Sequence, residues 1–415
     1  MPLSLPTDRP QAQDWLASLV VCVVALPLSL GIALASGTPI EAGLVAAVVG
    51  GVVAGLLSGA PLVASGPAAG LIAMVLQFNI QLGFQGLLLA TVAAGLFQIL
   101  FAVVRAGKWF LKVPAAVLEG MLGAIGLIIL LGQVHALLGA AVPRGVMASL
   151  QSLSTSWSLG VGAPVFWIGL ASIGIQVFWS KLFPRLKLVP GALPAVLLGT
   201  LVSLPFEMPR IQVAPLLDFV SQQSASIFRI ALQLSSWTSA ILGAGISLAL
   251  VASAESLLTA RAVAGLAQSA GVPMKLSLDR ELVAQGASNF ISGLLGGLPI
   301  TGVIVRSAAN VNSGARTHWS TVLHGVWVAL LVIVGAAVLK SIPIAALASV
   351  LVVTGMRLLN LGGFWKEWQH SRAQAGVWAI TFVSIVATDL LKGLGIGLLA
   401  AALVAVLRRR KQTTG

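Results

Sequence analysis

Long apolar segments follow one another from Trp15 almost to Leu407, and they constrain the fold more than any other feature of the sequence. Only 8% of the 415 residues are charged whereas 58% are hydrophobic, so the chain lacks the charged shell that a soluble domain of this length requires. A helix needs about 20 mostly apolar residues to span the hydrocarbon core of a bilayer. The sequence therefore predicts an all-α membrane protein with about fourteen transmembrane segments.

The apolar segments fall into two groups on either side of the most polar connection, residues 205–236. We expect a first repeat of seven segments within 1–204, an extracytoplasmic connection with an interfacial helix near its end, a second repeat of seven segments within 237–407, and a short basic cytoplasmic tail at 408–415. The expected segments lie near 15–36, 40–58, 65–77, 85–104, 114–132, 161–180, 190–204, 237–258, 282–295, 300–311, 318–338, 342–358, 374–389 and 391–407.

Lysine and arginine are distributed unevenly among the connections between these segments. If the chain alternates across the membrane from a cytoplasmic N-terminus, 18 of the 24 basic residues fall on the cytoplasmic side and 5 fall outside. Arg306 is set aside because it lies within a segment. The positive-inside rule therefore predicts an inner-membrane protein with both termini in the cytoplasm. The basic residues expected outside are Arg144, Arg210, Arg229, Lys340 and Lys392.

Each half contains an odd number of segments, so the second half must enter the membrane from the opposite side. This is the geometry of the inverted repeats of secondary transporters. The third segment of each half is short and opens with helix breakers, Ser65-Gly66-Pro67 in the first half and Pro299-Ile300-Thr301-Gly302 in the second. We expect two half-helices, beginning near Ser65 and Thr301, whose N-termini point at each other near the bilayer midplane.

Two such N-termini predict an anion site, because each carries about half a positive charge and several unpaired N–H donors. An anionic substrate is the natural ligand. The alternative interpretation is that these glycines and prolines only ease close helix packing, which is the role expected for Gly51, Gly55 and Gly59 at their four-residue spacing.

Two ionisable residues, Glu255 and Arg306, lie well inside apolar segments of the second half. A charge at the centre of a membrane helix costs about 2.5–3.5 kcal/mol even on the lenient insertion scale, so such residues usually face a wet cavity or a partner. Arg306 lies about one turn into its half-helix and could bind an oxyanion. Glu255 could take up a coupling proton, or it could form a structural ion pair with Arg306.

Other classes of function have little support in the sequence. The basic residues are dispersed without interleaved aromatic residues, which argues against nucleic acid as a partner. The four histidines include no zinc-protease pair, and neither a Walker A loop nor a GxSxG nucleophile motif occurs. The single cysteine, Cys22, is interpreted as a small core residue. We therefore expect no enzyme, no cofactor and no dedicated metal site.

Several stretches resemble the SulP family of anion transporters, and the resemblance spans nearly the whole chain. Residues 301–307 and 321–327 look like the bacterial subgroup often linked to carbonic anhydrase. Only four residues follow Lys411, so the cytoplasmic STAS domain common in the family is expected to be missing. The stretches that carry the resemblance are 25–33, 65–70, 255–260 and, most specifically, 280–317.

The resemblance implies a UraA-like inverted repeat with a core domain and a gate domain, and an elevator-type motion. It also implies that the substrate lies between the two half-helices, and we expect a homodimer in the lipid bilayer. The expected substrate-binding residues are Ser65, Gly66, Ala68, Thr301, Gly302, Val303, Ile304 and Arg306.

The resemblance also points to Glu255 and Thr259 as coupling residues. Sodium-dependent bicarbonate carriers of the family hold a carboxylate and a threonine at these positions. Those carriers have no arginine where this chain has Arg306, whereas proton-coupled and sodium-independent members do. A positive side chain can replace the cation, so a proton is favoured as coupling ion and sodium at Glu255 and Thr259 is the weaker alternative.

The sequence therefore predicts a secondary active transporter of small inorganic anions. Bicarbonate and sulfate are the favoured substrates, with proton coupling as an option. An anion channel, or an exchanger of chloride, bicarbonate or dicarboxylates, is the main alternative. A nucleobase permease shares the architecture, but Arg306 argues against a neutral substrate.

Overall fold

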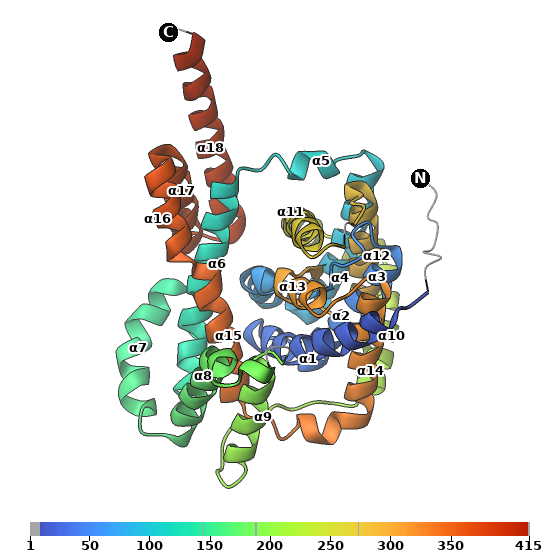
Figure 1. The fold of residues 1–415 in the computed structure, drawn as a ribbon, viewed down its shortest axis with the longest axis vertical. Helices are drawn as coiled ribbons and strands as arrows, with labels where there is room; N and C mark the ends of the chain where they lie inside the picture. Colours follow the sequence, from blue (N-terminus) through green and yellow to red (C-terminus); the bar gives the residue numbers. More distant parts are fainter. Residues whose placement is uncertain (1–8, 144, 187–188, 273, 414–415) are drawn as a thin grey trace. The chain divides into compact units, whose positions relative to one another are not determined.

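The computed structural model describes residues 9–143, 145–186, 189–272 and 274–413, with only the backbone of 366, 367, 370 and 408–413. Arg144, the basic side chains of the expected tail and residues 414–415 therefore lie outside what is described. Almost all of the described chain is helical (Figure 1). Its elements up to the central connection are α1 (Ala12–Ala35), α2 (Ile40–Val49), a π-helical turn at Gly50–Ala54, α3 (Gly55–Leu57), β1 (Ser65–Pro67), a 3₁₀ turn at Ala69–Leu71, α4 (Ile72–Val103), α5 (Gly107–Phe110), α6 (Ala115–Leu137), α7 (Val146–Gly160), α8 (Pro164–Leu182), a 3₁₀ turn at Pro184–Leu186 and α9 (Ala192–Ser203).

The rest of the chain repeats this pattern of long helices interrupted once by a short strand. Its elements are α10 (Leu216–Ala231), a 3₁₀ turn at Leu234–Ser236, α11 (Ser239–Ser269), α12 (Leu278–Leu294), β2 (Ile300–Gly302), α13 (Ile304–Asn312), α14 (Trp319–Leu339), α15 (Ile344–Leu359), α16 (Leu361–His370), α17 (Arg372–Ala387) and α18 (Leu390–Thr413).

Every segment expected from the apolar pattern has a helix or half-helix at its place in the structure. Nine helices of the described chain are long and apolar enough to cross a membrane, and Ala192–Ser203 and Arg372–Ala387 are shorter apolar helices. The third and fourth segments are joined in α4, where Gly83 adopts a φ of +70° and separates two helical stretches. That backbone conformation is open to glycine at little cost, so the kink falls where the sequence permits it.

Four helices, α5, α7, α10 and α16, lie outside the expected segments. The amphipathic α10 lies within the polar connection, where an interfacial helix was expected nearer the end. The apolar pattern did not predict α7, which contains several serines and a threonine and is largely exposed. Its exposed apolar residues include Met147, Leu150 and Leu159.

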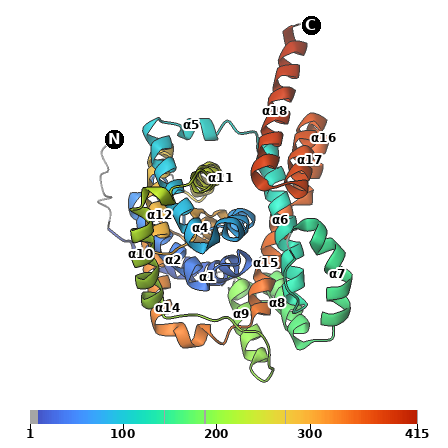
Figure 2. The same cartoon turned by 180° about the vertical axis from the view of Figure 1, so that it is seen from behind.

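The chain divides into two compact units, and each unit combines stretches from both halves of the sequence. The first unit comprises Met1–Leu111 and Trp167–Val350, and the second comprises Lys112–Phe166 and Leu351–Gly415. Within the first unit, α1, α2, α4, α11 and α12 lie together in both views (Figures 1 and 2), and α13 contacts α1 and α11. Within the second unit, α17 packs against α6, α16 and α18.

Glycines allow close helix packing in the first unit, as expected for Gly51, Gly55 and Gly59. A Cβ at Gly51 would lie 2.6 Å from the α-carbon of Gly325 on α14, and a Cβ at Gly55 would lie 2.7 Å from Oγ1 of Thr321. Gly59 approaches the start of α12 in the same way, against the backbone of Ser277. Close packing therefore explains these three glycines. The helix breakers that open the two third segments lie instead in or next to the short strands β1 and β2.

Candidate functional site

The two interrupted segments meet as a two-stranded antiparallel ribbon. Strand β1 pairs with β2 so that Ser65 lies opposite Gly302, Gly66 opposite Thr301, and Pro67 opposite Ile300. All six residues are buried. The structure thus brings together the breakers of both halves, although they are more than 230 positions apart in sequence. Helix-packing glycines alone do not require such a pairing, so the breakers have a second role.

The half-helices begin later than Ser65 and Thr301, where the sequence analysis had expected their starts. Helical backbone starts at Ala69 after β1 and at Ile304 after β2. One reason is that proline disfavours helical backbone in the residue before it, which keeps Gly66 extended. The other is that extended segments can pair, which satisfies backbone groups that would otherwise be buried without partners.

Apolar residues precede both helix starts and leave the first turns without side-chain caps. Ala68 and Val303 are the N-cap residues, and their side chains form no capping hydrogen bond. The first amides of a helix have no partner within the helix, and serine, threonine, aspartate or asparagine usually supplies one. Ala68, Val303 and Ile304 therefore belong to two helix starts whose amides suit an anion.

Arg306 is the third residue of α13, and its side chain is completely buried. Its Nη2 atom donates to Oγ of Ser29 at 2.9 Å and makes a longer contact with the carbonyl oxygen of Pro67 at 3.4 Å. The Nε and Nη1 atoms are buried and have no hydrogen-bond partner in the described part of the chain. Burying an unpaired guanidinium is expensive, so these donors mark a place where a negative ligand would be stabilised.

Glu255 lies on α11 beside the other helix start. A Cβ built at Gly70 would lie 2.7 Å from its Oε1 atom and 2.8 Å from Oε2, so the carboxyl group covers the turn that follows β1. Glu255 and Arg306 do not form an ion pair among the described residues, so the structure does not support the structural ion-pair interpretation. Thr259 follows one turn later on α11 and is buried. Glu255 and Thr259 thus place two oxygen-bearing side chains on one helix.

The hydroxyl of Ser65 points to a different side of the ribbon from Arg306. It accepts a hydrogen bond from Nε2 of Gln285 on α12 at 2.7 Å. A Cβ at the neighbouring Gly66 would instead meet the guanidinium of Arg306. Successive residues of a strand face opposite sides, so Ser65 supports the ribbon from α12 while Gly66 leaves space for the arginine. Thr301 lies opposite Gly66 and so shares the Arg306 side.

A line of polar residues on α12, which the sequence analysis did not interpret, anchors the interrupted segments. Glu281 accepts from Oγ of Ser58 at 2.9 Å and from the amide of Gly59 at 3.0 Å. Gln285 lies one turn further and donates to both Glu281 and Ser65, each at 2.7 Å. The signal was available, because buried polar residues four apart on an apolar chain must find partners.

Asn289 continues this line and holds β2. Its Oδ1 accepts from the amide of Ile300 at 2.6 Å, and its Nδ2 donates to the carbonyl of the same residue at 2.9 Å and to Gln98 at 2.7 Å. Ser256 of α11 accepts from the amide of Gly302 at 3.0 Å. Helices α11 and α12 therefore fix the ribbon from one side, and α1 meets Arg306 from the other.

Known proteins resemble this chain in sequence and in fold. The model of the sulfate permease family matches residues 12–381. The Bacillus subtilis protein YvdB, whose name marks it as a candidate sulfate transporter, is 29% identical over 97% of this chain and 74% of its own length. The bicarbonate transporter BicA of Picosynechococcus is 28% identical over 95% of this chain and 70% of its own length.

A solved structure gives the same picture of the fold. The transmembrane domain of a cyanobacterial bicarbonate transporter BicA superimposes with a TM-score of 0.73 and 26% identity, over 94% of this chain and 96% of that domain. The all-helical, multi-span fold with a seven-plus-seven inverted repeat is thereby confirmed. The protein is a multi-pass membrane transporter, not an enzyme. The chain belongs to the sulfate permease family of anion transporters.

Proposed function

We propose that this protein is a secondary active carrier of small inorganic anions, with bicarbonate or sulfate bound where the two half-helices start. Arg306, the amides after Ala68 and Val303, and the side chain of Thr301 would form the binding site. The observation that carries the proposal is the buried guanidinium of Arg306, whose Nε and Nη1 atoms are unpaired and which has no carboxylate within ion-pair distance among the described residues.

The charge at this place suits an anion of one or two negative charges. Arg306 contributes a full positive charge, and each of the two helix starts contributes about half of one. Ionised Glu255 would offset about half of that total and leave a site matched to a monoanion such as bicarbonate. Protonated Glu255 would leave a site matched to a dianion such as sulfate.

This balance links the substrate to the coupling ion. Sulfate transport would require Glu255 to take up a proton, whereas bicarbonate transport would not. The names of the relatives support both substrates, since YvdB is named for sulfate and BicA for bicarbonate. Sodium at Glu255 and Thr259 is the weaker alternative, because Arg306 already supplies positive charge beside the site.

An elevator-type alternating-access cycle fits a site built within one compact unit. In this proposal the first unit carries the anion as the core domain, and the second unit acts as the gate domain. The connection 205–236 would lie outside the cytoplasm, and both termini would lie inside, in a homodimer in the bacterial inner membrane. Positive charge on the connections supports that orientation.

Transport by purified protein in proteoliposomes tests the proposal. We expect saturable uptake of labelled bicarbonate or sulfate, with counterflow, and competition among bicarbonate, sulfate, chloride, nitrate and fumarate identifies the preferred anion. Arg306→Ala should reduce uptake about 100-fold, equivalent to about 2.7 kcal/mol, because a buried charge contact to the anion is lost. Wild-type uptake by this variant would overturn the site, and single-channel currents in planar bilayers would overturn the carrier mechanism.

A further inference from the structure

Ser29 of α1 is the side chain that contacts Arg306 at the shortest hydrogen-bond distance. Its Oγ accepts from Nη2 of Arg306 at 2.9 Å and donates to the carbonyl oxygen of Ala25 at 2.7 Å. Ser29 and Arg306 are both completely buried. The contact joins the first helix of the chain to the half-helix that follows β2, across 277 positions of sequence.

The hydrogens of these groups allow only one arrangement. A serine hydroxyl has one hydrogen, and here it is committed to the carbonyl of Ala25, so its lone pairs accept from Arg306. Nη2 has two hydrogens, and these point at Ser29 and at the carbonyl of Pro67. The guanidinium therefore keeps the donors of Nε and Nη1 for another partner, which the described residues do not provide.

The position of Ser29 is itself fixed, so it can act as a reference point for a long, flexible side chain. A Cβ at Gly43 of α2 would overlap the carbonyl oxygen of Ser29, which shows how closely the two helices pack. At the start of α1, Asp14 accepts from the amides of Arg316 at 2.8 Å and Thr317 at 2.9 Å. These contacts hold α1 against α2 and against the loop that precedes α14.

We infer that Ser29 is a positioning residue that sets the direction in which Arg306 offers its free donors, and thereby selects for oxyanions. This inference rests on the proposed anion site. An oxyanion such as bicarbonate or sulfate accepts hydrogen bonds along fixed directions, so its binding depends on the plane of the guanidinium. Chloride is spherical and accepts from any direction. Loss of the Ser29 hydroxyl should weaken oxyanion binding much more than chloride binding.

The test compares Ser29→Ala with Ser18→Ala, a matched control on the same helix. Ser18 is also completely buried, donates to the carbonyl of Trp15 at 2.7 Å, and accepts from Nε1 of Trp327 at 3.0 Å. Each substitution removes a buried hydroxyl that bridges a helix carbonyl and a side-chain N–H. Only Ser29 of the two contacts Arg306, so a general structural effect would appear in both variants.

For Ser29→Ala we expect the KM for bicarbonate or sulfate to rise roughly tenfold with little change in kcat, as for a lost hydrogen bond to a charged group. The concentration of chloride that inhibits uptake by half should change less than about threefold, so the preference for oxyanion over chloride should fall. Ser18→Ala should keep the wild-type KM and the wild-type preference.

Failure of this inference can be told apart from failure of the proposed function. If Arg306→Ala stops uptake but Ser29→Ala behaves like Ser18→Ala, Ser29 does not position the arginine and only the inference is wrong. If Ser29→Ala lowers kcat with an unchanged KM and preference, its role is structural and the inference is again wrong. If Arg306→Ala transports normally, the anion site itself is wrong.

Discussion

Gly66 of β1 lies directly against the guanidinium of Arg306 on α13: a Cβ built at Gly66 would overlap Nη1 and lie 3.1 Å from Cζ. The glycine is therefore required by the arginine rather than by backbone conformation, since its φ is not among the positive values. Gly66, in the first half of the chain, therefore leaves space for the side chain of Arg306, in the second half. This relationship gives the first prediction.

Gly66→Ala should abolish oxyanion uptake while the protein remains folded. The new methyl group displaces the end of a flexible side chain, which costs little stability but turns the guanidinium away from its present direction. Uptake in proteoliposomes and thermal unfolding in detergent measure the two effects. Gly243→Ala on α11 is the control, because its Cβ would meet nothing within 4 Å. Wild-type transport by Gly66→Ala would contradict the contact.

Glu255→Gln should uncouple sulfate transport from the proton gradient. Glutamine resembles the protonated carboxyl group but cannot release a proton, so sulfate exchange should continue while accumulation driven by a more acidic exterior is lost. Labelled sulfate uptake is measured with and without an imposed pH gradient, and a protonophore serves as the control in the same vesicles. Unchanged accumulation by the variant would assign Glu255 a structural role.

Asn289→Ala should destabilise the fold by roughly 2–4 kcal/mol, because it leaves the amide and carbonyl of Ile300 without their side-chain partner. The neighbouring Ser288→Ala is a matched control. Ser288 is equally buried, but its hydroxyl donates only to the carbonyl of Ala284 on its own helix, so its removal should cost less than about 1 kcal/mol. Thermal unfolding of both variants in detergent compares them, and equal losses would contradict the anchoring role of α12.

The sequence alone predicted the elements that depend on local composition. Apolar blocks located the helices, and the breakers at Ser65-Gly66-Pro67 and near Thr301 located both interruptions. Arg306 was identified because a charge within an apolar segment is costly wherever it lies. The missed α7 has the opposite character, since its serine-rich sequence carries no transmembrane signal.

Pairings between distant residues could not be predicted in this way. The pairing of β1 with β2, and the bond between Ser29 and Arg306, join positions more than 230 apart. The sequence suggested an ion pair between Glu255 and Arg306, because a sequence shows which charged residues are present but not where their side chains lie. It also grouped Ser65 with the anion ligands, whereas the alternation of side chains along β1 turns that hydroxyl toward Gln285.

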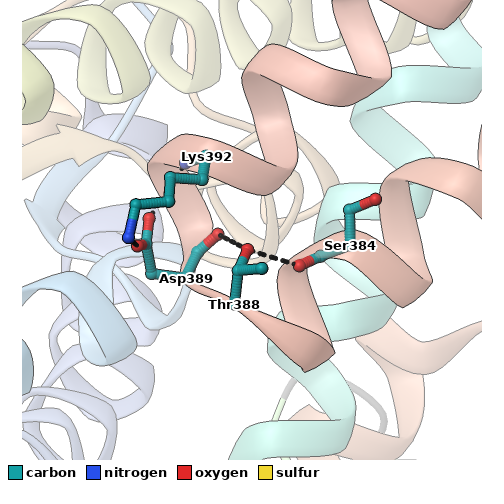
Figure 3. Close-up of polar contacts among 4 residues, drawn as sticks. All are labelled: Ser384, Thr388, Asp389 and Lys392. Carbon is teal, nitrogen blue, oxygen red and sulfur yellow. Dashed lines mark hydrogen bonds and ion pairs between the residues drawn. The ribbon is translucent and has the colours of Figure 1, made fainter.

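The turn between α17 and α18 gives a prediction outside the membrane-spanning segments. Figure 3 shows Asp389 and Lys392 in contact, with Nζ of Lys392 2.9 Å from Oδ2, and the backbone amide of Lys392 donates to Oδ1 at 2.9 Å. Partial burial alone would raise the pKa of Asp389, but the hydrogen bonds and charge of Lys392 hold that pKa below its usual 3.8. The carboxylate therefore stabilises the start of α18 at neutral pH.

Asp389→Asn should lower stability by about 0.2–1 kcal/mol at pH 7, because the ion pair with Lys392 is lost while asparagine can still cap the helix. A depressed pKa in the folded state means that the ionised carboxylate stabilises the fold above the unfolded value near 3.8, and that this stabilisation is lost as the pH falls through the lower folded value. Thermal unfolding of wild type and variant should therefore differ at pH 7 and converge as the pH falls below the folded-state pKa, which lies under 3.8. A difference that persists at low pH would contradict this origin.

Direct binding of labelled bicarbonate and sulfate to the purified protein tests the central claim, because it removes gating and coupling from the measurement. Wild type should show saturable binding that unlabelled oxyanion displaces, and Arg306→Ala should show none at the same concentrations while it elutes as a folded protein. Equal saturable binding by wild type and Arg306→Ala would contradict the account.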